Sequence, residues 1–355
     1  MKTQPRHPSL QRIAQVVGCT VFLASITAML TSCATTPATE VEAAASAPAA
    51  YEGGTKPGKL SPPAESEFVS LSISVPTETG SYPTWRTKSP GQPLLLLHPV
   101  NGLSPVFLHF ALELEKWGYR VYLPSLYGEA IDGEPAYGFD NGLAMIGYLK
   151  DDPRWNPVAL DTLGQIVDDV AAMARSVSRQ EGGRRVAVLG HSLTGMIPLA
   201  ILDEPAVGLA VLAQPATPVR RLHEILFRIP QSEEEKVALS VSDEDWARIA
   251  GAMQSHPRKR IAGFHYQHDP MATIESFDAL QGRLEKAGLA GRFTAYVLSR
   301  AGEPYAAGRE DWVVESETSE RAKMLTPHST YVVPENDRDR EWFRARLRET
   351  LAHGW

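Results

Sequence analysis

The hydrophobic pattern of the chain alternates between short apolar runs and longer stretches with helical spacing. Residues 93–99 (PLLLLHP) form a continuous apolar run, which is typical of a strand buried on both faces. Residues 71–75 (LSISV) alternate apolar and polar positions, as an edge or early antiparallel strand does. Residues 104–117 have the spacing of a helix, and Gly118 is placed to end it.

The same alternation continues to the end of the chain. We expect further strands at 120–125, 184–190, 207–215, 260–269 and 292–299, and helices at 159–179, 193–203, 273–287 and near 338–352. Strands that alternate with helices of this length predict an α/β fold with a mostly parallel sheet and helices on both faces.

Two long segments interrupt this rhythm. Residues 216–258 contain amphipathic stretches with SEEEK and SDEDW, and residues 300–327 precede the sequence PHSTYVV. Long connections in a compact α/β domain are often lids or binding loops. The alternative is that the two insertions have no functional role, and the sequence does not decide between these two interpretations.

The start of the chain has the composition of an export signal. Lys2, Arg6 and Arg12 come before an apolar run over residues 13–30. This order of a basic and then an apolar region is typical of a secretory signal. We therefore divide the chain into a signal peptide (1–32), a flexible tether rich in Ala, Pro, Thr and Ser (33–67), and one folded domain (68–355).

Leu30-Thr31-Ser32-Cys33 resembles the cleavage motif of bacterial lipoproteins, in which the cysteine receives the lipid. This predicts an anchored protein of the bacterial envelope, and Ala34 after the cysteine favours the outer membrane. A cleaved signal with an incidental Cys33, or an uncleaved anchor, remains possible. The other cysteine, Cys19, lies inside the apolar run, so the mature domain would have no disulfide.

Charge restricts the partners of the mature chain. The formal net charge is −7, and removal of residues 1–32 takes away three positive charges and leaves −10. An acidic chain argues against nucleic acid as the main partner.

A serine follows the predicted strand at 184–190. In VAVLGHSLTG, Gly190 precedes Ser192 by two residues, after a strand and before a predicted helix. This is the context of a nucleophile elbow, the sharp strand-to-helix turn that exposes a catalytic serine. Thr194 replaces the second glycine of the usual G-x-S-x-G pattern, with Gly195 next, and we expect it to crowd the turn mildly. An ordinary helix N-cap explains a serine here equally well.

A longer block carries a family resemblance. LLLLHPVNGLSPVFLHFALELEKWGYRVYLPSLYGE, together with the serine motif, resembles α/β hydrolases of the dienelactone hydrolase-like group over residues 90–299. The resemblance implies an α/β-hydrolase fold with Ser192 as nucleophile. It also implies an oxyanion hole made by the backbone N–H of Leu193 and that of Val100 or Asn101.

The resemblance also suggests an acid and a base. The sequence FHYQHDPMATIESF places Asp269 at the acid position, although a turn cap before Pro270 is the alternative, and Asp243 and Asp245 are weaker rivals. The family's histidine usually follows the last strand, but here Ala301-Gly302 is followed by Glu303. Either His328 is the base, in the order Ser192, Asp269, His328, or the base has been lost.

Other residues point to no cofactor. His98 is expected to brace the oxyanion loop, His191 to pack near the site, and His265 and His268 to face opposite sides of a strand. The sequence has no metal-ligand cluster and no glycine-rich phosphate loop, so we expect neither metal nor nucleotide. The function predicted is a serine hydrolase for a small-molecule or lipid ester. The alternative is a lipid-anchored binding or scaffold protein on a hydrolase fold.

Overall fold

The computed structural model describes residues 63–77, 80–99, 102–127, 154, 164–216, 239, 241–266, 274–300, 313–316 and 337–355. The proposed signal peptide and nearly all of the tether lie outside these residues. The first described element is a 3-10 turn, η1 (Glu65–Glu67), which leads directly into the first strand.

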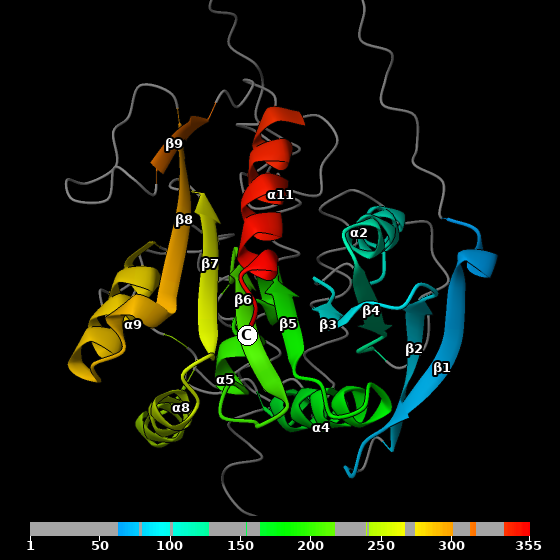
Figure 1. Ribbon diagram of the computed structural model, residues 1–355, viewed down its shortest axis with the longest axis horizontal. Helices are drawn as coiled ribbons and strands as arrows, with labels where there is room; N and C mark the ends of the chain where they lie inside the picture. Colours follow the sequence, from blue (N-terminus) through cyan, green and yellow to red (C-terminus); the bar gives the residue numbers. More distant parts are fainter. Residues whose placement is uncertain are drawn as a thin grey trace, which may run out of the picture. The chain divides into compact units, whose positions relative to one another are not determined.

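One mixed sheet organises the described residues (Figure 1). Its nine strands lie in the order β1-β2-β4-β3-β5-β6-β7-β8-β9. All neighbours from β4 to β9 are parallel, whereas β2 is antiparallel to both β1 and β4. The strands are β1 (Phe68–Ser74), β2 (Ser81–Thr87), β3 (Gln92–Leu97), β4 (Tyr119–Pro124), β5 (Val186–His191), β6 (Val207–Ala213), β7 (Arg260–Tyr266), β8 (Phe293–Arg300) and β9 (Val313–Ser316).

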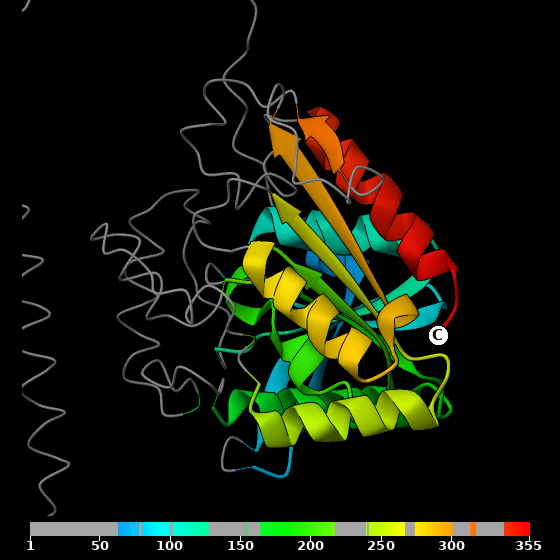
Figure 2. The same cartoon turned by 90° about the vertical axis from the view of Figure 1, so that its left-hand side faces the viewer.

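Helices cover both faces of the sheet (Figure 2). On one face lie α2 (Pro105–Lys116) and α11 (Asp337–Ala352). On the other face lie α4 (Ile166–Gln180), α8 (Asp243–Ser255) and α9 (Ile274–Lys286). The central strands are therefore buried on both sides, which explains why their sequences are almost wholly apolar.

The leucine run of β3 shows how one strand serves both layers. Leu94 and Leu96 pack into the cluster with α2 and α11, and Leu95 and Leu97 pack into the cluster with α4, α8 and α9. All four side chains have no exposed surface. Successive residues of a strand point to opposite faces, so a strand between two helical layers needs an apolar residue at every position.

Helix α2 begins and ends as its sequence indicates. The Ser104 side chain accepts a hydrogen bond from the backbone N–H of Phe107, and Pro105 occupies the first turn. At the other end Gly118 has φ +94°, a left-handed conformation that favours glycine. The predicted helix at 104–117 is confirmed.

Three parts of the fold differ from the predictions. Strand β2, which contains Pro83, and strand β9, inside the expected insertion at 300–327, were not predicted. The predicted helix at 193–203 is wrong. The chain instead forms a 3-10 turn, η2 (Ser192–Thr194), and a single helical turn, α5 (Ile197–Ala200), with Pro198 inside it.

Among the described residues of the expected lid segment at 216–258, the regular element is helix α8. Helix α8 begins with a capping box in which Ser242 and Asp245 bond to each other's backbone N–H groups. Among the residues that the structure describes, no helix is long and apolar enough to cross a membrane.

The order of the strands creates a switch point beside β3. The chain runs from β3 outward to β4 and then returns to the other side of β3 as β5. Connections from β3 and β5 therefore leave in opposite directions, and in open α/β sheets ligands bind at the carboxyl ends of such strands. The described residues that leave this edge are 98–99 and 192–195.

Candidate active site

Ser192 lies at the carboxyl end of β5, at this switch point. Its backbone has φ +54°, and in the described part of the chain the other non-glycine residue with positive φ is Gln214. The N-cap reading of Ser192 is wrong, because η2 has His191 at its N-cap and α5 has Met196. A left-handed serine between a strand and a helical turn is the strained geometry of a nucleophile elbow.

Two glycines make this turn possible. A Cβ atom on Gly190 would lie 2.1 Å from the carbonyl oxygen of Thr194. A Cβ atom on Gly195 would lie 2.4 Å from the Cα atom of Pro215, which follows β6. Both contacts are with backbone atoms that cannot move independently, so the tight turn requires glycine at both positions.

Thr194 is accommodated in the turn rather than crowding it. Its side chain is fully buried, and its hydroxyl accepts a hydrogen bond of 3.0 Å from the N–H of His191. The same hydroxyl lies within donating distance of three carbonyl oxygens, at 3.2 Å from Leu97, 3.1 Å from His98 and 3.1 Å from His191. Thr194 thus joins the elbow to the end of β3, where the expected oxyanion loop begins.

His98 fixes that loop from its other side. The fully buried ring donates through Nδ1 to the carbonyl oxygen of Pro99 at 2.8 Å and accepts through Nε2 from the N–H of Leu126 at 2.9 Å. Burial lowers its pKa to about 4, against smaller raising effects of backbone hydrogen bonds. The neutral imidazole thus holds Pro99 and Leu126 through two hydrogen bonds. Its role beside an oxyanion loop stays a prediction, because Val100 and Asn101 lie outside the described residues.

The carbonyl of Ser192 is also held in place. It accepts hydrogen bonds from the N–H of Gly195 at 2.9 Å and from the N–H of Ala216 at 3.0 Å, so the segment after β6 supports the elbow. Gln214 in that segment has φ +45°, is buried, and donates its N–H to the carbonyl oxygen of Phe264. Sequence reasoning did not identify Gln214. A glutamine at the end of an otherwise apolar strand was the available signal.

The structure places two of the predicted catalytic residues, Ser192 and Leu193. Ser192 retains 6% exposed surface and Leu193 8%, and both stand at the start of η2. The N–H of Leu193 thus belongs to the first turn after β5. The remaining predicted site residues lie outside the described residues: Cys33, Val100, Asn101, Asp269, Glu303 and His328.

Two further histidines have packing roles. His191 is buried within the elbow, and the ring of His265 packs edge-on against Phe277, with ring centroids 5.8 Å apart. Within the described ranges, no group of three or more His, Cys, Asp or Glu residues could hold a metal ion.

The sequence as a whole matches the model of the Alpha/beta hydrolase family over residues 94–354. The chain belongs to the alpha/beta hydrolase family. The match begins in β3 and extends through α11, so this hydrolase contains the switch point and the serine elbow within the shared region.

Structural neighbours among the solved structures include hydrolases. An esterase of Pyrococcus furiosus is 14% identical, with a TM-score of 0.47 over 85% of this chain and 96% of that one. A dienelactone hydrolase-like promiscuous phosphotriesterase from metagenomic libraries is 14% identical, with a TM-score of 0.43 over 69% and 93%. No curated protein matches the sequence.

Proposed function

We propose that this hydrolase cleaves carboxylic esters through an acyl-enzyme on Ser192. The observation that carries the proposal is the left-handed backbone of Ser192, at the carboxyl end of β5 and beside the switch point. Backbone strain of this kind is retained where surrounding contacts enforce it, and it clusters at active sites. Gly190, Thr194 and Gly195 enforce it here.

The proposed reaction has two steps. His328 takes the proton of the Ser192 hydroxyl, the serine oxygen bonds to the ester carbonyl carbon, and the alcohol leaves with the proton from His328. Water then attacks the acyl-enzyme with His328 again as base, which releases the acid and restores the serine. Asp269 orients the histidine, and the N–H groups of Leu193 and of Val100 or Asn101 stabilise the oxyanion.

The braced loop supports the second oxyanion donor in this proposal. Val100 and Asn101 follow His98 and Pro99, whose backbone is held by Thr194 on one side and by the His98 ring on the other. Donors that are already in place when charge develops contribute most to transition-state stabilisation.

Turnover of p-nitrophenyl esters tests the assignment. We expect Ser192→Ala and His328→Ala to lose activity by a factor of about 10³ or more, and Asp269→Asn to lose nearly as much. Ser255→Ala, at the exposed end of α8, and His353→Ala, in the exposed turn after α11, are the matched controls and should keep full activity. Full activity of His328→Ala would move the base elsewhere, and full activity of Ser192→Ala would refute the mechanism.

We also propose that a lipid on Cys33 anchors the enzyme in the bacterial envelope. The support is the basic and apolar leader that ends at Leu30-Thr31-Ser32-Cys33. Mass measurement of protein from the membrane fraction tests it, with Cys33→Ala as the comparison. The lipid mass should appear in the wild type and be absent from the variant. An unlipidated wild type would refute the anchor.

A further inference from the structure

A basic pocket lies at the edge of the sheet opposite to Ser192. Its volume is about 510 Å³, and it is lined by Gln92, Arg184, Arg185, Pro257, Arg258 and Trp355. Gln92 is the first residue of β3, Arg184 and Arg185 precede β5, and Pro257 and Arg258 precede β7. The pocket therefore opens at the amino ends of the parallel strands, whereas the elbow is at their carboxyl ends.

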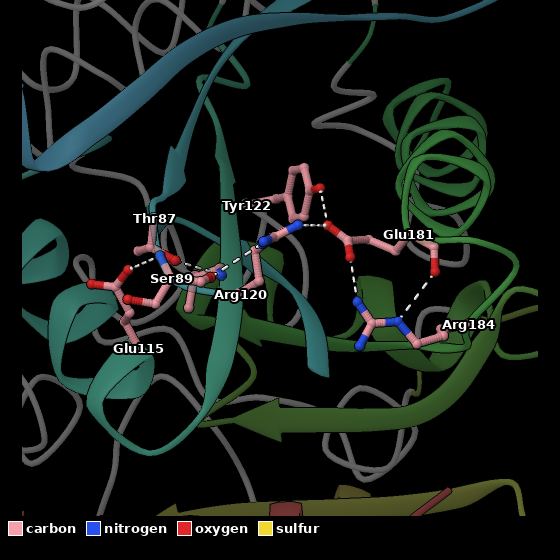
Figure 3. Close-up of polar contacts among 8 residues, drawn as sticks. Thr87, Ser89, Glu115, Arg120, Tyr122, Glu181 and Arg184 are labelled. Atoms are coloured by element: carbon pink, nitrogen blue, oxygen red, sulfur yellow. Dashed lines mark hydrogen bonds and ion pairs between the residues drawn. The ribbon is translucent and has the colours of Figure 1, made fainter. Parts of the chain in front are cut away.

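Arg184 is held at the rim of this pocket by a buried carboxylate (Figure 3). Glu181 accepts from Arg184, from Arg120 at 2.9 Å and from the Tyr122 hydroxyl at 2.6 Å. Burial opposes the charge of Glu181, but these hydrogen bonds outweigh it and lower the pKa of the carboxyl group. Because two arginines share one carboxylate, this cluster keeps a net positive charge.

The other two arginines of the pocket have no acidic partner within the described part of the chain. Arg185 approaches a ring nitrogen of His256 at 3.5 Å, and Gln92 donates to the carbonyl oxygen of Arg185 at 3.2 Å. Arg258 is exposed and has neither an ion pair nor a hydrogen bond among these residues. Two guanidinium groups thus line one concave surface without an ion-pair partner among the described residues.

Neighbouring groups increase this local positive charge. Lys259 is fully buried and donates to the carbonyl oxygens of Leu202, Glu204 and Val207. Burial and then the charge of Arg185 lower its pKa to about 8. Arg260 has a lowered pKa through burial and the nearby Arg292. Like charges are concentrated here in a chain whose formal net charge is −7.

The pocket has one aromatic wall. Trp355 packs on Gly208 so closely that a Cβ atom there would lie 2.1 Å from the indole ring, and Trp355 stacks on Tyr119 with centroids 6.3 Å apart. The indole therefore packs against residues of two strands, Gly208 of β6 and Tyr119 of β4. An aromatic wall beside cationic side chains is suited to a small ligand with a charged group.

We propose that this pocket binds a small ligand that carries a phosphate group. A phosphate monoester or inorganic phosphate carries about two negative charges, which match the guanidinium groups of Arg185 and Arg258. Guanidinium groups bind phosphate through paired N–H donors. A monocarboxylate has a single negative charge and would leave one of the two guanidinium groups without a matching charge. The volume is in the range of small-molecule sites, about 300 to 1,000 Å³.

Calorimetric titration of the full chain with inorganic pyrophosphate at constant ionic strength tests this site. We expect Arg258→Gln and Arg185→Gln each to weaken binding about tenfold or more. Arg346→Gln removes the same charge from helix α11, outside the pocket lining, and should bind as the wild type does. Unfolding temperatures close to the wild type would show that the variants remain folded.

The phosphate group has two possible sources, free in solution or on a lipid headgroup. Sedimentation with phosphatidic acid vesicles, whose headgroup is a phosphate monoester, compared with phosphatidylcholine vesicles, distinguishes them. Loss of pyrophosphate binding in Arg258→Gln supports a free ligand. Loss of the phosphatidic acid preference in Arg258→Gln, with no pyrophosphate binding by the wild type, supports a headgroup. The proposal is overturned if the wild type binds neither probe, or if Arg346→Gln reduces binding as much as Arg258→Gln.

Discussion

The hydroxyl of Thr194 lies 3.2 Å from the carbonyl oxygen of Leu97, across the boundary between β5 and β3. These strands are parallel neighbours, with Leu97 paired to Gly190. Thr194 therefore connects the nucleophile turn to the last residue of the strand that leads into the expected oxyanion loop. In the proposed mechanism, one buried side chain thus couples the nucleophile turn to the loop that would act on the same carbonyl group.

Replacement of Thr194 by valine should reduce turnover more than substrate binding. Valine has nearly the same shape as threonine. It would leave the N–H of His191 and the neighbouring carbonyl oxygens without the hydrogen bonds of the hydroxyl. We expect kcat to fall about tenfold to a hundredfold with KM little changed, and stability to fall by about 1 to 3 kcal/mol. Thr194→Ser keeps the hydroxyl and should recover most of kcat. Equal losses in both variants would contradict the positioning role.

Replacement of Ser192 by glycine should stabilise the fold while it abolishes activity. The left-handed conformation costs a residue with a side chain roughly 1 to 2 kcal/mol, whereas it costs glycine little. The greater freedom of glycine in the unfolded chain offsets part of this gain. Urea unfolding should therefore show Ser192→Gly more stable than Ser192→Ala by about 0.5 to 1 kcal/mol. The reverse order would mean that the turn is unstrained.

Alanine at Gly190 should destabilise the fold strongly. The added Cβ atom would meet the Thr194 carbonyl oxygen and the Pro198 ring, at 2.1 Å and 2.9 Å. We expect a loss of about 3 kcal/mol or more, or failure to fold. Gly251 of α8 has open space around its Cα atom, so Gly251→Ala is the control and should be stabilising by up to about 1 kcal/mol. Similar unfolding temperatures for both variants would contradict the steric argument.

The free energy of unfolding should fall in acid because of His98. Its pKa is lowered from 6.5 to about 4 in the folded protein, so the unfolded chain binds more protons between these values. The neutral ring contributes its full stabilisation at pH values above the pKa that His98 has in the unfolded chain. This stabilisation is lost as the pH falls toward the pKa of His98 in the folded protein. Between about pH 7 and pH 5 the free energy of unfolding should drop by about 2 kcal/mol from this group.

His98→Gln removes this titration and should make the pH dependence correspondingly shallower, although the variant is less stable overall. Urea unfolding at the two pH values measures the effect, with His353→Gln on the exposed surface as the control. The assignment is wrong if His98→Gln loses as much stability on acidification as the wild type.

The layered fold could be predicted from the sequence because burial on two faces leaves a plain signal. PLLLL and VAVLG are apolar at every position, and both became central parallel strands. β2 was missed because its burial alternates irregularly and Pro83 lies within it, and its position depends on pairing with β1 and β4. The helix expected at 193–203 failed because Pro198 and the close packing of Gly195 on Pro215 limit the regular structure there.

The elbow could be predicted from local sequence, but its supports could not. Gly190 and Ser192 are two residues apart and have a recognisable spacing. The bonds from Thr194 to Leu97 and from Ala216 to Ser192 join residues distant along the chain, and only the strand order brings them together. The basic pocket could not be predicted for the same reason, because Gln92, Arg185 and Arg258 lie at the starts of three different strands.

The central claim is that Ser192 is a nucleophile, and covalent labelling measures this most directly. Folded wild-type protein is treated with a fluorophosphonate, which bonds to an activated serine, and the labelled peptide is identified by mass. We expect one label per chain on Ser192 and none on Ser192→Ala. Absence of label on the wild type, or equal labelling of Ser192→Ala, would contradict it.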